Sequence, residues 1–383
     1  MLGRRGPCSI FIKDDKIGWI GPVDEAPSAN QMIDATGLMA MPGVVDCHTH
    51  TVWGGSRADE FRQRLGGRPY SEILEEGGGI LSTVQQTRST EDSVLLDATV
   101  AKFRAFVSRG VTTVEVKSGY GLTPEHERRM LSIALAAGKK VGLRVFTTFL
   151  GAHAVPLEYR GRREAYVTHV IEEQIPAVVG CADFIDVYVD RGAFTLEEGQ
   201  RILRAGRDAG LKLRIHAEQV AYTGAAEMAA NEGALSADHL ERIDAAGIAA
   251  LAANETVAVL LPGARLYLKD DPPPVEALRA AGVRMAIATD YNPGSSPVDD
   301  IWVCATLACV QMGLTVEEAI VGMTTNAAAA LGQTDLGRIT VGGPADIALF
   351  RPPMGEAAEL TPLVHQLSGV HAERVVCRGV VIL

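Results

Sequence analysis

The sequence predicts a (β/α)8 TIM barrel flanked by a small β-sandwich, and three observations support this fold class. Eight nearly continuous apolar runs are spaced along the chain, as expected for strands buried on both faces of a parallel sheet. Helical patterns lie between most of these runs, which predicts βαβ units. Several runs end in a histidine or an aspartate, and in such barrels the chemistry lies at the carboxyl ends of the strands.

The eight predicted strands follow one another along a stretch of about 250 residues, the usual size of such a barrel. They are rich in Val, Ile, Leu, Phe and Thr. In order they are Val44–His50, Val111–Gly119, Leu143–His153, Asp183–Asp190, Leu211–Gln219, Ala234–Leu240, Thr256–Gly263 and Val283–Asn292.

Three helix starts can be read between these strands. Thr123 is a capping residue followed by Pro124, and proline is favoured at the first helical position. The segments Thr195–Glu198 and Thr315–Glu318 both fit the capping box, in which threonine and glutamate satisfy each other's backbone N–H groups. These starts predict a helix after each of three barrel strands.

The two ends of the chain do not fit the barrel. The segment Cys8–Gly21 predicts a hairpin that turns at Lys13–Lys16, and Gly337–Phe350 and Val370–Leu383 predict further short strands. We expect both ends to meet in one sandwich, because two separate extensions would each bury few apolar residues. The expected units are the N-terminal part of the sandwich, the barrel and the C-terminal part of the sandwich, at residues 1–41, 42–336 and 337–383.

Composition and charge agree with a soluble cytoplasmic enzyme. The chain has 383 residues, of which 47% are hydrophobic, enough for a large core and a small additional unit. A net charge of −11 provides no basic stripe for nucleic acid. No apolar run reaches the ~18 residues that span a bilayer, and Met1–Arg5 precedes no apolar segment, so we expect no secretory signal. The six cysteines lack zinc-ribbon or disulfide-framework spacing.

His48 and His50 are the most informative pair in the chain. Residues two apart in a strand point to the same side, so these imidazoles can hold a single metal ion. For an isolated histidine, an ordinary hydrogen-bonding role in a loop is the better interpretation. A shared site is favoured because later runs end in further candidate side chains, namely His153, His216, His239 and Asp290.

Six segments carry a resemblance to a known family. They are Pro42–His50, Glu115–Leu122, Phe149–Pro156, His216–Gln219, Ser236–Leu240 and Ala288–Pro297. On these segments the chain resembles the amidohydrolase superfamily and, within it, the imidazolonepropionase family. The first and fourth segments are shared widely in the superfamily, whereas Lys117–Gly121 and Asp290–Gly294 are much more specific to imidazolonepropionases.

The resemblance implies a barrel of the metal-dependent amidohydrolase type with one metal ion per chain. The implied ligands are His48, His50, His216 and Asp290. Three imidazoles and a carboxylate suit zinc first and iron second, and a bound divalent ion would lower the pKa of its water toward ~7. Lys117 is not expected to be a ligand, although binuclear relatives use a carboxylated lysine.

The implied reaction is hydrolysis of the ring C–N amide bond of 4-imidazolone-5-propanoate to N-formimidoyl-L-glutamate, in histidine degradation. The resemblance assigns His239 to polarising the attacked carbonyl or orienting the hydroxide. A fifth metal ligand is the alternative role for His239. Asp290 is expected to accept the proton of water and pass it to the leaving ring nitrogen.

The implied substrate carries a propionate tail, which an acidic protein must hold with a local cation. Arg57 matches the carboxylate-binding arginine of the family, and a guanidinium pairs well with a carboxylate. Tyr120 and His153 match the residues that assist it. For Arg57 alone, a surface salt bridge with Asp59 or Glu60 would be the better interpretation.

Four further residues match substrate-binding positions of the family. Gln219 matches the position that contacts the imidazolone ring, where some members have glutamate. Asn292, Gly294 and Ser295 match residues that hold the open-chain product. The run Gly77–Gly79 is either a mobile loop over the site or a helix-ending turn.

Two other functions are weighed against this one. A different amidohydrolase, such as a deaminase of a cyclic amidine, is disfavoured because a neutral nucleobase needs no arginine at Arg57. A non-catalytic assembly protein is disfavoured because the full ligand set is present. The expected partners are a small anionic substrate and a second copy of the chain in a homodimer, with no nucleic acid and no membrane.

Overall fold

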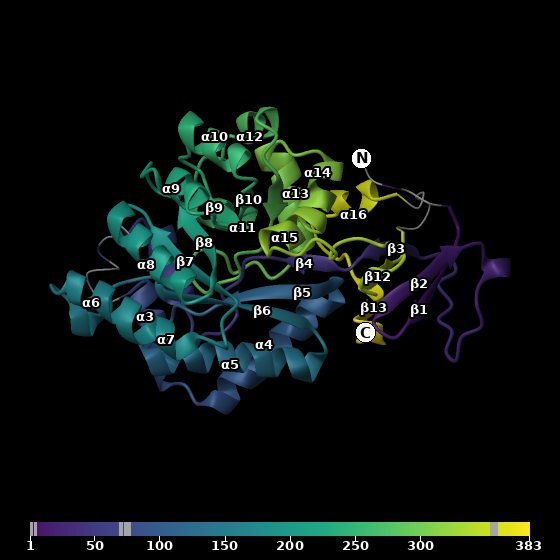
Figure 1. Cartoon of the computed structure of the whole chain (residues 1–383), viewed down its shortest axis with the longest axis horizontal. Coiled ribbons are helices and arrows are strands. Elements are labelled where there is room, and N and C mark those ends of the chain that lie inside the picture. The colour runs from purple at the N-terminus through teal and green to yellow at the C-terminus, as the bar shows by residue number, and fades with distance from the viewer. Residues whose placement is uncertain (1–2, 4–5, 69–71, 73–77, 353–358) are drawn as a thin grey trace.

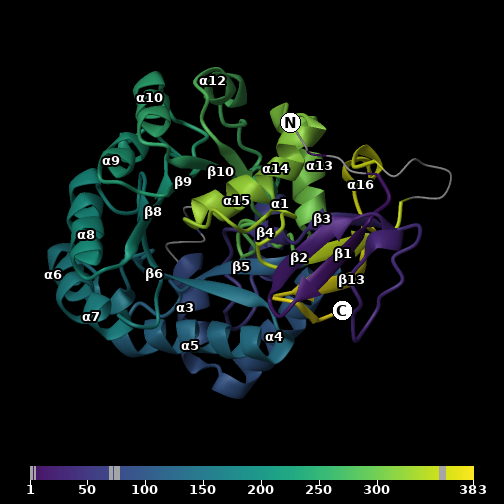
Figure 2. The same cartoon turned by 45° about the vertical axis from the view of Figure 1, so that its right-hand side comes forward.

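The computed structural model describes residues 3, 6–68, 72, 78–352 and 359–383 (Figure 1). The arginines at positions 4 and 5 and Gly77 of the glycine run lie outside these residues. The described residues contain an eight-stranded sheet, a four-stranded sheet and a two-stranded sheet. The two smaller sheets lie together beside the larger one (Figure 2).

The eight predicted strands are all present, in the predicted order, and each lies within its predicted run. They are parallel, and each pairs with the next along the chain. Their bounds are β4 (Val44–Asp46), β5 (Val111–Lys117), β6 (Arg144–Ala152), β7 (Phe184–Val189), β8 (Lys212–Ala217), β9 (Ser236–His239), β10 (Val257–Leu260) and β11 (Met285–Ile287).

The barrel closes where the segment after β4 meets the segment after β11. The backbone N–H of His50 donates to the carbonyl of Tyr291, and that of Asp290 donates to the carbonyl of His48, both at 2.9 Å. Both β4 and β11 are shorter than the runs predicted for them. His48 and His50 lie in an extended segment beyond β4, because the ladder between β4 and β5 ends at Asp46.

Helices cover the outside of the barrel (Figure 1). Their bounds are α1 (Ala58–Leu65), α3 (Ile80–Ser89), α4 (Asp92–Ser108), α5 (Pro124–Val141), α6 (Arg163–His169), α7 (Ile175–Val178), α8 (Leu196–Asp208), α9 (Ala225–Asn231), α10 (Ala245–Ala253), α11 (Pro262–Leu268), α12 (Val275–Ala280), α13 (Ile301–Met312), α14 (Val316–Gly322), α15 (Thr325–Ala330) and α16 (Thr361–His365). Single turns add η1 (Val23–Glu25), η2 (Leu157–Tyr159) and the π-helical η3 (Val170–Gln174). None of the described helices is both long and apolar enough to cross a membrane.

The three predicted helix starts are confirmed. The hydroxyl of Thr123 accepts a hydrogen bond from the backbone N–H of His126 at the start of α5. Thr195 and Thr315 form complete capping boxes at the starts of α8 and α14. Each cap satisfies backbone N–H groups that a helix start leaves without a partner.

The chain termini build the two smaller sheets. The hairpin is formed by β1 and β2, and in the second sheet a strand from near the N-terminus pairs with C-terminal strands. The bounds are β1 (Ser9–Lys13), β2 (Lys16–Gly21), β3 (Met39–Pro42), β12 (Ile347–Phe350), β13 (Ala372–Cys377) and β14 (Val380–Val381).

One apolar cluster joins the hairpin to the four-stranded sheet. Ile17 of β2 packs in it with Ile347 and Leu349 of β12 and Val376 of β13. The prediction that both ends meet in one structure is therefore confirmed, because neither end has a core of its own within the described residues. The domain boundaries at residues 41 and 337 stay a prediction.

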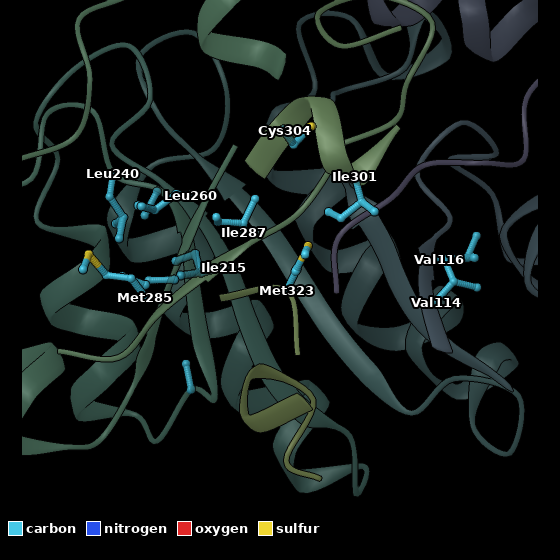
Figure 3. Close-up of a cluster of buried hydrophobic side chains, with 14 of the residues drawn as sticks. Val114, Val116, Ile215, Leu240, Leu260, Met285, Ile287, Ile301, Cys304 and Met323 are labelled. Carbon is cyan, nitrogen blue, oxygen red and sulfur yellow. The ribbon is translucent and has the colours of Figure 1, made fainter. Parts of the chain in front are cut away.

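The largest apolar core lies between the barrel strands and the helices around them. Figure 3 shows part of it, with buried side chains from β5, β8, β10 and β11 and from α13. The labelled side chains are Val114, Val116, Ile215, Leu240, Leu260, Met285, Ile287, Ile301, Cys304 and Met323. This packing fixes the strand ends from which the candidate site is built.

Candidate metal-dependent active site

Three buried imidazoles converge at the carboxyl end of the barrel. His48 and His50 follow β4 and His216 lies in β8, and one nitrogen from each lies within 4.8 Å of the others. Asp290, which follows β11, joins them. Its Oδ1 atom lies 3.3 Å from Nε2 of His48 and 3.4 Å from Nε2 of His50. The four side chains expected to bind a metal are thus brought together.

Carboxylates behind the cluster orient two of its imidazoles. Nδ1 of His48 donates to Oδ2 of Asp238 at 2.6 Å, and Nδ1 of His216 donates to Oδ1 of Asp186 at 3.0 Å. Metal-binding histidines usually have such a partner on the second ring nitrogen. Burial also holds the pKa of His216 well below its usual range, which favours the neutral imidazole that binds metals.

Two ring nitrogens of the cluster have no hydrogen-bond partner within the described part of the chain. They are Nε2 of His48 and Nδ1 of His50, and both are buried. A buried polar atom without a partner costs free energy unless a ligand satisfies it. Nε2 of His48 is the unpartnered nitrogen that approaches Oδ1 of Asp290, and together with that carboxylate it fits a bound metal ion. For His50 the nitrogen near Asp290 is Nε2, so its unpartnered Nδ1 is not part of this argument.

Two buried cations support the orienting carboxylates. Nζ of Lys117 lies 2.9 Å from Oδ2 of Asp186 and 3.0 Å from Oε1 of Glu115. Nη2 of Arg214 lies 3.0 Å from Oδ2 of Asp238. All these side chains are fully buried, so each carboxylate needs a cation nearby. The Lys117 amine thus forms salt bridges with two of these carboxylates.

The sequence analysis missed these supporting residues. Asp186 and Asp238 lie inside apolar runs predicted to be strands, and Arg214 lies in another. A charged residue in a strand buried on both faces is unusual and needs a partner inside the barrel. A charged residue within an otherwise apolar run was therefore the feature of the sequence that could have identified these three supporting residues.

His239 lies beside the three-histidine cluster. Its ring centroid is 5.4 Å from that of His216 and 6.1 Å from that of His48. Burial lowers the pKa of His239 to about 4, so its imidazole is neutral near pH 7. The residue has a left-handed backbone, with φ of 82°, an uncommon conformation that often marks functional sites.

Arg57 precedes α1 and is largely buried. Its Nε atom donates to Oε2 of Glu60 at 2.9 Å, and Oε1 of Glu60 accepts from the backbone N–H of Gly79 at 3.0 Å. The side chains of Arg57 and Glu60 are only 8% and 13% exposed. The pairing with Glu60 that was weighed from sequence is therefore present, but it is not a surface salt bridge. Asp59 is 86% exposed and pairs with another arginine.

The loop after Asp290 is shaped around Arg57. Oδ1 of Asn292 accepts from the backbone N–H groups of Gly294 and Ser295, both at 2.8 Å. A Cβ atom on Gly294 would lie 2.0 Å from Nη1 of Arg57, so the guanidinium packs directly on this glycine. The predicted product-binding loop and the predicted carboxylate-binding arginine are thus in contact.

Tyr120, His153 and Gln219 surround the histidine cluster. The His153 ring stacks on that of His50 with centroids 5.4 Å apart, and the Tyr120 ring lies 5.4 Å from His153. Nδ1 of His153 donates to the carbonyl of residue 119 at 3.0 Å, and burial lowers the pKa of His153 to about 3. Oε1 of Gln219 accepts from the Tyr188 hydroxyl at 3.0 Å.

Comparison with known proteins agrees with the resemblance read from sequence. The model of the amidohydrolase family matches residues 39–382. An imidazolonepropionase from Paracidovorax citrulli is 46% identical over 358 residues, which cover 92% of this chain and 86% of the relative. An imidazolonepropionase from Cupriavidus necator is 45% identical over 350 residues, covering 90% of this chain and 84% of the relative.

Solved structures share the fold at low sequence identity. An adenosine deaminase from Xanthomonas campestris with bound zinc has a TM-score of 0.72 and 17% identity, covering 98% of this chain and 88% of that one. A triazine hydrolase from an Arthrobacter species has the same TM-score and identity, with coverage of 98% and 89%. These structures confirm the barrel architecture. From its sequence relatives and its matched family model, the chain is a hydrolase that belongs to the imidazolonepropionase family of the amidohydrolases.

Proposed function

We propose that the protein hydrolyses the ring C–N amide bond of 4-imidazolone-5-propanoate to N-formimidoyl-L-glutamate, a step of histidine degradation. The observation that carries the proposal is the buried cluster of His48, His50, His216 and Asp290, in a chain that is similar to imidazolonepropionases over about nine-tenths of its length. Family membership argues against a deaminase of a neutral nucleobase. The complete cluster argues against a non-catalytic assembly role.

The same four side chains would hold one metal ion per chain. Three imidazoles and one carboxylate suit zinc first, with iron as the alternative. When bound, such an ion supplies hydroxide at neutral pH and polarises a carbonyl oxygen. The remaining chemistry falls to the residues around the cluster.

Asp290 is proposed to handle the proton. Its carboxylate accepts a proton from the attacking water as the new C–O bond forms at the ring carbonyl. It then delivers this proton to the ring nitrogen as the C–N bond breaks, so that this nitrogen leaves as the neutral N–H of the formimidoyl group. His239, which lies beside the cluster, donates a hydrogen bond to the carbonyl oxygen as negative charge develops there.

The propionate tail is proposed to bind at Arg57. This guanidinium lies in a largely buried position against Gly294, where a charge-assisted pair with a carboxylate is strong. Tyr120 and His153 line the space between Arg57 and the cluster in this proposal, and Gln219 contacts the ring. Asn292, Gly294 and Ser295 hold the open-chain product.

We also propose that the protein works in the cytoplasm as a homodimer. The absence of any described helix able to cross a membrane is compatible with this location. Light scattering of the purified protein at micromolar concentration tests the dimer directly. A mass equal to one chain, 40.7 kDa, would contradict it.

An assay with freshly generated 4-imidazolone-5-propanoate tests the function. The protein is loaded with zinc or with iron, its metal content is measured, and formation of N-formimidoyl-L-glutamate is followed. A cyclic amidine without a carboxylate serves as the comparison substrate. Turnover of the amidine without turnover of the imidazolone would overturn the proposal.

A further inference from the structure

An acidic side chain lies behind His239, as one does behind His48 and His216, but the contact differs. Nδ1 of His239 and Oε2 of Glu241 are 3.9 Å apart, and both side chains are almost fully buried. Neither atom has a hydrogen-bond partner among the described residues. Two unsatisfied polar atoms facing each other in a buried place indicate an interaction that is completed in the working enzyme.

The backbone is bent at a cost to place Glu241 there. His239 and Leu240 both have left-handed backbones, with φ of 82° and 72°, which is unfavourable for residues with a side chain. The bend is held by hydrogen bonds from Leu240 to the carbonyl of Ala217 and from Arg242 to the carbonyl of Glu218. The Leu240 side chain is fully buried in the main core (Figure 3). Strain that the surroundings maintain in this way often serves a function.

We propose that Glu241 is a positioning residue for His239, whose carboxyl group hydrogen-bonds Nδ1 and so leaves Nε2–H to face the substrate carbonyl. The inference rests on the proposed function of His239. The present 3.9 Å separation is longer than a hydrogen bond. Hydrogen bonds of catalytic groups are often long without substrate and tighten in the complex.

The protonation of the acid decides which ring nitrogen carries the proton. Burial raises the pKa of Glu241 to about 8; Asp270 and Asp290 act in the same direction, and Arg242 opposes them. A neutral carboxyl group donates its O–H to Nδ1, and the imidazole proton then resides on Nε2. At His48 the arrangement is reversed, because an ionised Asp238 accepts Nδ1–H and leaves Nε2 free to bind metal.

The acid behind each imidazole thus separates two kinds of histidine. An ionised aspartate makes His48 or His216 a metal ligand, whereas a neutral glutamate makes His239 a hydrogen-bond donor. This accounts for three neighbouring imidazoles being divided between two tasks in one site. It also predicts that the hydrogen-bonding capacity of Glu241, and not its charge, is what His239 requires.

Kinetics of two Glu241 variants test this prediction. Glu241→Leu is expected to lower kcat by about 10- to 100-fold, with KM within about twofold of wild type and one metal ion per chain. Glu241→Gln is expected to restore most of kcat, because its amide N–H also donates to Nδ1. Glu255→Gln, the same substitution at an 85% exposed side chain, is the matched control and should leave kcat unchanged. A Leu variant with wild-type kcat, or a Gln variant as slow as the Leu variant, would overturn the proposal.

The tautomer of His239 gives a readout that needs no turnover, and it is measured with a non-hydrolysable lactam carboxylate bound so that the contact with Glu241 is closed. The chain has nine histidines, so ring-¹⁵N spectra of metal-loaded protein can be assigned by the signal lost in His239→Asn. Wild type and Glu241→Gln should carry the His239 proton on Nε2, and Glu241→Leu should shift toward a mixture. A proton on Nδ1 in wild type would overturn the proposal. If the tautomers agree but 4-imidazolone-5-propanoate is not hydrolysed, only the proposed function fails.

Discussion

Nδ1 of His48 and Oδ2 of Asp238 lie 2.6 Å apart, and neither side chain reaches solvent. The same carboxylate oxygen is 3.0 Å from Nη2 of Arg214. Asp238 therefore fixes the ring of His48 while Arg214 balances its charge. The metal affinity of the site should depend on residues that never touch the metal.

Asp238→Asn tests this dependence. The amide still accepts from Nδ1 of His48 but lacks the charge that strengthens the bond, so we expect metal affinity to fall by about 10- to 100-fold. Competition with a chelator of known affinity measures the change. Asp59→Asn, at an 86% exposed side chain, should leave it unaltered. His216→Ala should lose the metal altogether, and full occupancy there would contradict the assigned ligand set.

Replacing His239 or Asp290 should separate metal binding from turnover. His239→Asn is expected to keep the metal and lose about 10²- to 10⁴-fold in rate, because a positioned hydrogen-bond donor is removed. Asp290→Asn should retain part of the metal and be nearly inactive, since no proton acceptor remains. Metal content and single-turnover rate are measured on both variants. A metal-free His239 variant would identify His239 as a ligand.

Arg57→Ala should mainly weaken substrate binding. Loss of a buried charge-assisted contact, which also leaves Glu60 without its cation, should cost about 2–5 kcal/mol. This appears as a raised KM with unchanged metal content. Arg62→Ala, at an 81% exposed arginine in the helix that follows Arg57, is the control. An Arg57 variant with the wild-type KM would show that Arg57 does not bind the substrate carboxylate and only forms the salt bridge with Glu60.

Gly294→Ala should reproduce part of the Arg57 effect without altering the arginine itself. The added Cβ would lie 2.0 Å from Nη1 of Arg57, so the guanidinium must move. We expect a higher KM and a smaller further effect when the two substitutions are combined. Gly6→Ala would meet no atom within 4 Å and, like Gly294, Gly6 has no left-handed backbone, so it is the control. Equal KM values for both glycine variants would refute the contact.

Glu232 should contribute to acid sensitivity of the fold. Its hydrogen bonds, first to Arg204 and then to Arg207, lower the pKa to about 2, below that of an exposed glutamate. The stabilisation is therefore present above pH ~4.5 and is lost as pH falls toward 2. Glu232→Gln should cost at most about 1 kcal/mol near pH 7, because the arginines are half exposed. Denaturant unfolding measured from pH 7 down to 3 should show the free energies of unfolding of wild type and Glu232→Gln converging. A difference in unfolding free energy that does not change with pH would contradict this.

The sequence predicted the barrel because its strands are buried on both faces and therefore read as apolar runs. The cluster was predictable because His48 and His50 stand at the end of one such run and the other ligands at the ends of later runs. The supporting residues were harder to predict from sequence, because the partner of an acid such as Asp186 lies on a different strand and can be identified only once the order of the strands in the sheet is known. The left-handed backbone at His239 and Leu240 could not be predicted from sequence, because glycine is the usual sign of that conformation and neither residue is a glycine.

Pairing of β3 with β12 has a consequence for synthesis of the chain. β3 ends at Pro42, whereas β12 begins at Ile347, so this one strand of the four-stranded sheet waits for nearly the whole chain to be translated. At typical elongation rates this is a delay of roughly 15 to 60 s. During that time the edge of β3 has no strand to pair with and is open to other nascent chains. Ribosome-bound chains that stop before β12 should therefore be the most prone to aggregate.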